Sequence, residues 1–189
     1  ELSATFGDRT FFETLRIEPY YRFAATRAPA AASFFNRLIE DTLATRLTLV
    51  HGDYSPKNIL VFQERLILLD HEVIHWGDPA FDLGFSLTHL LSKAFHLPAH
   101  RRAFLEAAQR YWETYQNAAG GLARQADLES RAVRHTLGCL LARVDGRSPL
   151  EYLTPVERSR QRQRVLRSIL APPQRLPELI DDYGTSLGL

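Results

Sequence analysis

Two carboxylates and an amide, Asp53, Asn58 and Asp70, have the residue types and the spacing that phosphoryl transfer requires. Transfer from ATP needs a carboxylate that orients the attacking hydroxyl, and oxygen ligands that hold Mg²⁺ on the phosphates. Asp53 has the right chemistry for the first task. Asn58 and Asp70 offer the oxygen atoms that Mg²⁺ prefers.

Short strands are expected to position these residues. The apolar runs 47–50, 59–62 and 66–69 are typical of strands, and the polar segment 51–58 and the turn 63–65 separate them. Asp53 and Asp70 then stand just past strand ends, on either side of a hairpin. A polar loop held by strands at both ends is well suited to fixing side chains for chemistry.

The segments around this region are expected to be irregular before it and helical after it. Residues 1–28 are rich in aromatic side chains and show no regular pattern, and Pro29 is expected to open a helix over residues 30–47. Asp78 followed by Pro79 is typical of a helix start. The helix after Pro79 is apolar on nearly every side, which predicts burial. Further helices are predicted from Pro98 to Gly120, over 127–144, from Pro155 to Pro172 and near 176–182.

Composition places the chain among globular proteins of one domain. It has 189 residues, of which 45% are hydrophobic and 24% are charged, with a net charge of +1. That charge balance gives no reason to expect a nucleic-acid partner, and no apolar run approaches the roughly 18 residues that span a membrane. The lone Cys139 excludes an internal disulfide and is expected to be a small buried hydrophobic residue.

Three segments in order carry a resemblance to a known family. They are His51–Asn58, which matches the kinase catalytic-loop pattern His-x-Asp-x-x-x-x-Asn, then Leu69–Glu72 and Gly77–Leu83. Together the segments resemble the aminoglycoside phosphotransferase and choline kinase group of the protein-kinase-like fold, over about positions 47 to 93. The resemblance implies an α+β, predominantly α-helical fold. It would be the C-terminal lobe of such a kinase, with a small β-hairpin region carrying the catalytic loop.

The same resemblance implies roles at the centre of the site. Asp53 would be the catalytic aspartate, and Asn58 and Asp70 would bind the nucleotide's phosphates through Mg²⁺. Glu72 falls where some members place another carboxylate near the metal or the substrate. A solvated loop glutamate explains Glu72 equally well.

Supporting roles follow from the resemblance as well. His51 would support the catalytic loop, Asp82 would accept hydrogen bonds from its backbone, and Asp78 would brace the loop after Asp70. Without the resemblance, the simpler interpretation of Asp78 is a helix cap. His71 stands where the group commonly has an aromatic residue, so it either packs there or brings a titratable group beside the metal.

The resemblance also implies partners. These are ATP as co-substrate, Mg²⁺ and a small-molecule hydroxyl acceptor of the aminoglycoside, sugar or amino-alcohol type, in the cytoplasm. Ser55 stands where protein kinases have a lysine, which favours a small-molecule kinase. The chain begins at Glu1, contains no methionine, and has no glycine-rich phosphate loop and no lysine before the catalytic loop. We therefore expect residues 1–189 to be the C-terminal lobe alone, inactive without an N-terminal ATP-binding lobe.

Two other functions are compatible with the sequence. A catalytically inactive, pseudokinase-like binding or scaffolding protein would have the same fold, although the intact Asp53, Asn58 and Asp70 argue against it. The arginine-rich segment 158–167 could form a surface for nucleic acid, but a solvated helix face explains it better.

Overall fold

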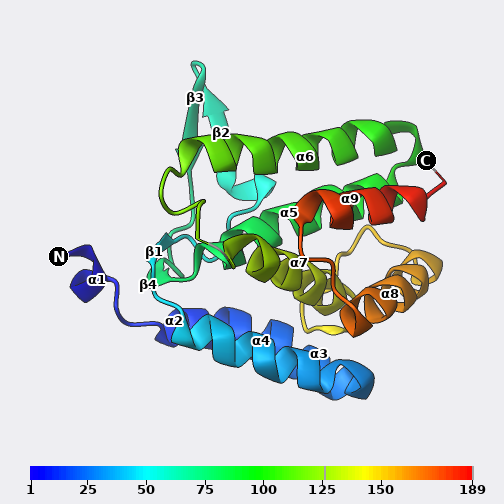
Figure 1. The fold of residues 1–189 in the computed structure, drawn as a ribbon, viewed down its shortest axis with the longest axis horizontal. Coiled ribbons are helices and arrows are strands. Elements are labelled where there is room, and N and C mark those ends of the chain that lie inside the picture. Colours follow the sequence, from blue (N-terminus) through cyan, green and yellow to red (C-terminus); the bar gives the residue numbers. More distant parts are fainter. Residues whose placement is uncertain (126, 189) are drawn as a thin grey trace.

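The protein is described by a computed structural model over residues 1–125 and 127–188. It is mostly helical, with two small antiparallel sheets, and is therefore an α+β protein (Figure 1). The longer helices are α4 (Ala32–Ala44), α5 (Pro79–His96), α6 (Arg101–Ala118), α7 (Leu128–Asp145), α8 (Pro155–Leu170) and α9 (Leu176–Thr185). The short helical segments are α1 (Leu2–Thr5), α2 (Thr10–Phe12), α3 (Phe23–Arg27), η2 (Pro29–Ala31), η3 (Pro56–Asn58) and η4 (Pro98–His100).

Helices α5 and α7 form the centre of the helical body. They pack against each other, and α6, α8 and α9 surround them (Figure 1). Gly84 of α5 permits a close approach, because a Cβ atom at this position would lie 2.6 Å from the backbone nitrogen of Thr136 in α7. The predicted burial of α5 is confirmed, since its residues Phe81, Leu83 and Phe85 are almost fully enclosed.

The expectation of an irregular N-terminal segment was wrong. Residues Glu13–Arg22 form a wide π-helical segment, η1, which continues into α3 and runs beside α4 (Figure 1). Pro19 inside η1 has no N–H to donate, so an ordinary α-helical ladder cannot continue through it. Burial of Ile17 and Tyr21 in the core stabilises the segment instead.

Two antiparallel strand pairs frame the polar loop. Strand β1 (Thr48–Val50) pairs with β4 (His75–Gly77), a strand that the sequence did not predict, and Val50 lies opposite His75. Strand β2 (Ile59–Phe62) pairs with β3 (Arg65–Leu68) through a two-residue turn whose Gln63 and Glu64 both have positive φ. The predicted strand 66–69 therefore lies one residue earlier, while the helices after Asp78 are found close to their predicted limits.

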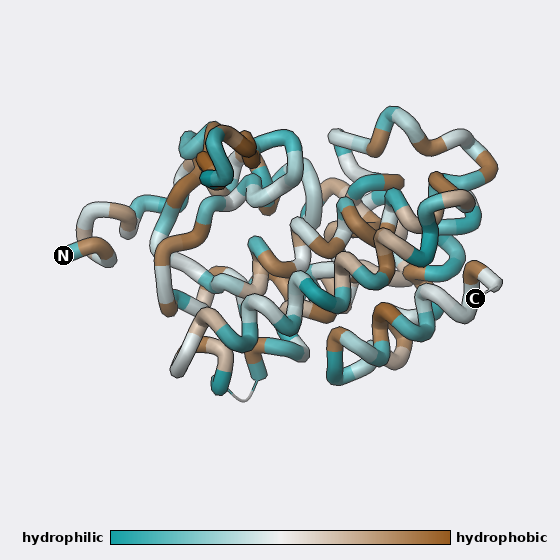
Figure 2. The backbone as a smooth tube through the Cα atoms, turned by 90° about the horizontal axis from the view of Figure 1, so that it is seen from above, coloured by the Kyte–Doolittle hydropathy of each residue, from teal (hydrophilic) through white to brown (hydrophobic). Residues whose placement is uncertain are grey.

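The β2–β3 hairpin projects from the helical body and is unusually apolar for an exposed element. Val61 and Leu66 each keep 69% of their surface exposed, and Phe62 keeps 56%. The hairpin stands apart in Figure 1, and its hydrophobic residues appear as brown segments in Figure 2. Exposed apolar clusters of this kind mark surfaces that bind a partner or a ligand.

Two further expectations are settled by the structure. Cys139 is fully buried, and burial raises the pKa of its thiol to about 11, which confirms it as an unreactive core residue. Across residues 1–125 and 127–188, no helix combines the length and the hydrophobicity that a membrane span would need.

Candidate active site

Helix α5 fixes the backbone of the loop between β1 and η3. The carboxylate of Asp82 accepts the N–H of His51 at 2.7 Å through one oxygen and the N–H of Gly52 at 2.9 Å through the other. One helical turn later, the hydroxyl of Ser86 donates to the carbonyl of Tyr54 at 2.5 Å. Burial raises the pKa of Asp82 to about 6, although the two N–H groups favour its charged form.

Arg16 of η1 holds the same loop through its guanidinium group. Its Nε donates to the carbonyl of Gly52 at 2.6 Å, and its Nη2 lies 3.3 Å from Oδ2 of Asp53. Arg16 was not predicted as a site residue, because it precedes the loop by more than thirty positions in a segment that was expected to be irregular. Its sequence neighbours give no signal of this role, which arises from the packing of η1.

Asp53 is buried with its two carboxylate oxygens in different surroundings. Oδ2 receives the side-chain amide of Asn58 at 2.9 Å, the ammonium of Lys57 at 3.0 Å and the guanidinium of Arg16 at 3.3 Å. No hydrogen bond or ion pair of the described residues involves Oδ1. The side chain is therefore immobilised through one oxygen, and the other is left for a hydroxyl group.

Asn58 is oriented by Asp53 and lies at the base of the β2–β3 hairpin. Its amide nitrogen donates to both the backbone carbonyl and Oδ2 of Asp53, at 2.9 Å each. The amide oxygen is then available as a ligand. The N–H of Leu69 donates to the carbonyl of Asn58 at 2.9 Å, so the hairpin brings Asn58 beside the residue that directly precedes Asp70.

Asp70 and Glu72 are both exposed, in the segment between β3 and β4. Asp70 has a φ of 65°, a left-handed conformation that aspartate tolerates better than most residues. The described residues contain no group of three His, Cys, Asp or Glu side chains that could hold a metal by themselves. Mg²⁺ does not require one, because it commonly binds one or two carboxylates together with nucleotide phosphates. The oxygen donors of Asn58 and Asp70 fit such a metal.

His51 is engaged through both ring nitrogens and does not act as a free base. Its Nδ1 accepts the N–H of Asp53 at 3.2 Å, so its Nε2 carries the proton and donates to the carbonyl of Leu69 at 3.0 Å. Burial lowers the pKa of His51. The ring of the exposed His71 lies 5.0 Å from that of His51, edge to face. His51 thus links the polar loop to the end of the hairpin.

Asp78 connects helices α5 and α7. Its Oδ1 accepts the N–H of Ala80 at 3.0 Å, which caps α5 as predicted, and its Oδ2 receives Nε of Arg131 at 2.8 Å. Burial nevertheless raises the pKa of Asp78. Its hydrogen bonds among the described residues fix the start of α5, and through it Asp82, rather than the loop after Asp70.

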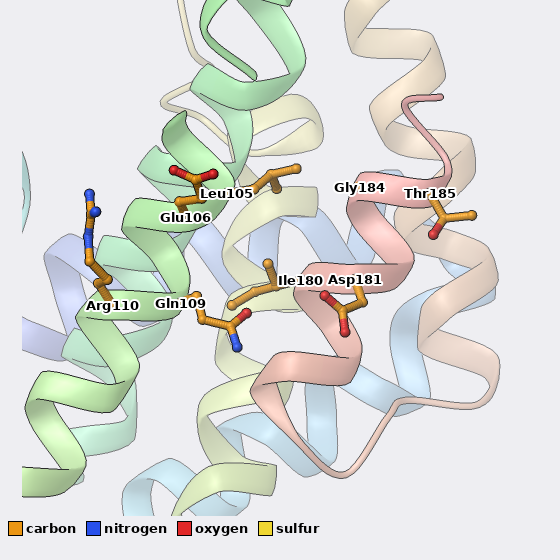
Figure 3. A pocket seen from close by; sticks show the side chains of 8 residues that line it. All are labelled: Leu105, Glu106, Gln109, Arg110, Ile180, Asp181, Gly184 and Thr185. Atoms are coloured by element: carbon orange, nitrogen blue, oxygen red, sulfur yellow. The ribbon is translucent and has the colours of Figure 1, made fainter. Parts of the chain in front are cut away.

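Cavities lie both near this loop and far from it. A mainly apolar cavity of about 530 Å³ is lined by Tyr54, Asp82 and Tyr115, among others, between the start of α5 and the end of α6. Another of about 520 Å³ separates α6 from α9, with Glu106, Ile180 and Asp181 on its walls (Figure 3). No residue of the loop 51–58 lines the second cavity, so it does not belong to the candidate site.

The fold and the loop together define a helical α+β protein whose loop 51–58 is tethered to α5 and η1 and carries a buried carboxylate, Asp53. The sequence profile of the phosphotransferase enzyme family, APH, matches residues 4–124, which is more than half of the chain. The chain therefore belongs to this family, and the resemblance noted from the three motifs is confirmed. Among curated proteins, no significant match was found.

Proposed function

We propose that this protein is an ATP-dependent phosphotransferase that transfers the γ-phosphate to a hydroxyl of a small molecule. The acceptor would be of the aminoglycoside, sugar or amino-alcohol type. Membership of the phosphotransferase enzyme family supports the general class of reaction. The observation that carries the proposal is the asymmetric setting of Asp53, whose Oδ2 is held by three donors while Oδ1 has no polar partner among the residues that the structure describes.

In this mechanism Asp53 orients the acceptor. Oδ1 accepts the hydrogen bond of the attacking hydroxyl and takes its proton as the hydroxyl oxygen bonds to the γ-phosphorus and the bond from that phosphorus to the departing ADP breaks. Arg16, Lys57 and Asn58 keep the carboxylate in one rotamer, which reduces the entropy lost on reaching the reactive geometry. Asp82 and Ser86 hold the loop backbone on helix α5, so Asp53 is positioned by a rigid element.

Asn58 and Asp70 are the residues that would hold Mg²⁺ with ATP. The metal supplies charge neutralisation on the phosphates when it is bound. The amide oxygen of Asn58 is directed by the hydrogen bonds of its nitrogen to Asp53, and Asp70 follows directly on Leu69. Glu72 is exposed close by in sequence and is proposed as an auxiliary carboxylate for metal or substrate.

We further propose that the chain is the C-terminal lobe of a protein-kinase-like fold and works with an N-terminal lobe. The exposed apolar residues of the β2–β3 hairpin, including Val61, Phe62 and Leu66, support this arrangement. The hairpin that carries them has Asn58 and Asp70 at its base, and a lobe that covered it would exclude water from the nucleotide. Activity is expected to require both lobes.

The proposal is tested by release of ADP from Mg²⁺-ATP in the full-length protein, with a panel of aminoglycosides, sugars and amino alcohols. Acceptor-dependent release is expected, and Asp53→Asn should abolish it while ATP affinity survives. Unchanged kcat in Asp53→Asn would refute the role of Asp53. Binding of Mg²⁺-ATP without turnover on any acceptor would favour the pseudokinase-like function instead.

A further inference from the structure

A smaller cavity is lined by the second half of the loop 51–58 and adjoins Asp53. It has a volume of about 280 Å³, just below the roughly 300 Å³ at which the usual range for ligand sites begins. The link to Asp53 is direct, since Lys57 on its wall lies 3.0 Å from Oδ2 of Asp53. Its walls come from the loop 51–58, from α5 and from α6, and consist of Ser55, Pro56, Lys57, His89, Leu90, Lys93 and Phe104.

Two residues of this wall carry buried polar atoms that have no hydrogen-bond partner within the described part of the chain. They are the hydroxyl oxygen of Ser55, whose exposed surface is 0%, and Nε2 of His89. Unpaired buried polar groups are rare because each costs free energy. Two of them on one cavity, beside a carboxylate suited to orient a hydroxyl, are positions for hydrogen bonds to a ligand.

His89 contributes these hydrogen bonds as a neutral ring. Burial lowers its pKa to about 4, and the nearby guanidinium of Arg143 acts in the same direction. A neutral imidazole can donate to or accept from a hydroxyl group. His89 therefore offers no charge to a cationic ligand and suits a polyol or a sugar.

The charged groups of the cavity wall are both cations. Lys57 is paired with Asp53, whereas Lys93 forms no ion pair among the described residues. The ammonium of Lys93 lies 4.0 Å over the ring of Tyr152, which holds it on one side and leaves its other N–H groups available. No Asp or Glu of the described residues lines this cavity. An acceptor with several amino groups would meet repulsion here without a compensating carboxylate.

We propose that this cavity selects an acceptor of sugar-ring size that carries an acidic group and no cationic one. Its hydroxyls bond to Ser55 and His89, and its acidic group is turned toward Lys93. This inference rests on the proposed phosphotransfer and narrows the acceptor class within it. The aminoglycoside and amino-alcohol types are then disfavoured relative to sugar acids.

The test is a series of three similar pyranoses that differ in charge: glucuronate, glucose and glucosamine. Their binding to the full-length protein is measured by ligand-observed NMR titration without ATP. Glucuronate should bind tightest and glucosamine weakest. Lys93→Ala should weaken glucuronate about tenfold and remove its advantage over glucose, while His89→Phe should weaken both alike. Arg110→Ala is the matched control and should change nothing, because Arg110 is a cation on the separate cavity between α6 and α9 (Figure 3).

Three results would overturn the inference. These are tightest binding of glucosamine, no binding of any of the three at millimolar concentration, and unchanged glucuronate affinity in a folded Lys93→Ala variant. Because binding is read without ATP, these results are separate from a failure of phosphotransfer. If no assay showed release of ADP but the three sugars still bound in the expected order, the proposed phosphotransfer would be contradicted. The inference that this cavity binds an acidic sugar would still hold.

Discussion

The carboxylate of Asp82 holds the backbone of His51 in place, with one oxygen 2.7 Å from its amide nitrogen and the other bonded to the next N–H. A helix thereby fixes the start of the loop 51–58, and Asp53 follows two residues after His51. This relationship places the position of the proposed catalytic carboxylate under the control of α5.

Asp82→Ala should lower the free energy of unfolding by about 2 kcal/mol, because two backbone N–H groups lose their acceptor. Asp82→Asn should cost less, since it keeps one acceptor oxygen for one of the two groups. Urea denaturation of both variants measures the difference. Equal stability of Asp82→Ala and the unaltered protein would contradict a structural role for these hydrogen bonds.

Arg16→Gln is expected to destabilise the protein by about 3 kcal/mol, because Asp53 loses a buried cationic partner and the carbonyl of Gly52 loses its donor. Arg16→Lys should remain impaired, since an ammonium cannot reproduce the two directed contacts of the guanidinium. Arg22→Gln is the matched control on the same helix. Arg22 pairs with Glu18 on the exposed surface, so its loss should change stability by no more than about 0.5 kcal/mol.

The candidate site could be predicted from the sequence where its residues are close together along the chain. Asp53, Asn58 and Asp70 are connected by one loop and one hairpin, and strand patterns with turn residues define both locally. Arg16 could not be found in this way, since its contact with Asp53 depends on how η1 packs. Strand β4 was missed for a similar reason, because three residues gain strand geometry only by pairing with β1.

The helices likewise divide into those that local sequence signals predict and one that depends on tertiary packing. Those after Asp78 have clear start signals in Asp78-Pro79 and Thr154-Pro155, and the second of these forms a capping box with Glu157. The segment Glu13–Arg22 has no such signal and contains a proline. Its helical form is stabilised by tertiary burial of Ile17 and Tyr21, which no local pattern expresses.

Stability should fall on acidification from pH 7 to pH 5. Burial lowers the pKa of His75 and His89 to about 4 and of His135 to about 3, from 6.5. Below pH 6.5 these histidines bind more protons in the unfolded chain than in the folded one. Protonation therefore favours unfolding, and at pH 5 each histidine has lowered the free energy of unfolding by about 2 kcal/mol. Asp82 has the opposite effect. Because its pKa is raised to about 6, its contribution to the free energy of unfolding falls as the pH rises from 4 to 6. On going from pH 7 to pH 5, the stability lost through the three histidines exceeds the stability gained through Asp82.

His75→Gln should reduce this acid sensitivity. The variant loses the stacking of His75 on Phe12, so it is expected to be less stable at pH 7 but to lose less on going to pH 5. His100→Gln, at an exposed position, should keep the full pH dependence. Urea denaturation at pH 7 and pH 5 measures the free energy of unfolding of both variants. If His75→Gln lost as much stability between the two pH values as the unaltered protein, His75 would not contribute to the acid sensitivity.

Gly84→Ala should disrupt the contact between α5 and α7 on which the position of Asp82 depends. The added Cβ would lie 2.6 Å from the backbone nitrogen of Thr136 and close to His135, and neither helix backbone can yield without moving the other. We expect a loss of about 2 kcal/mol in the free energy of unfolding. Because α5 also holds the loop, kcat should fall in the same variant. Gly121→Ala is the control, since its Cβ would meet no atom within 4 Å and should leave stability and kcat unchanged. If Gly84→Ala proved as stable as Gly121→Ala, the close approach of the two helices would not be what positions the loop.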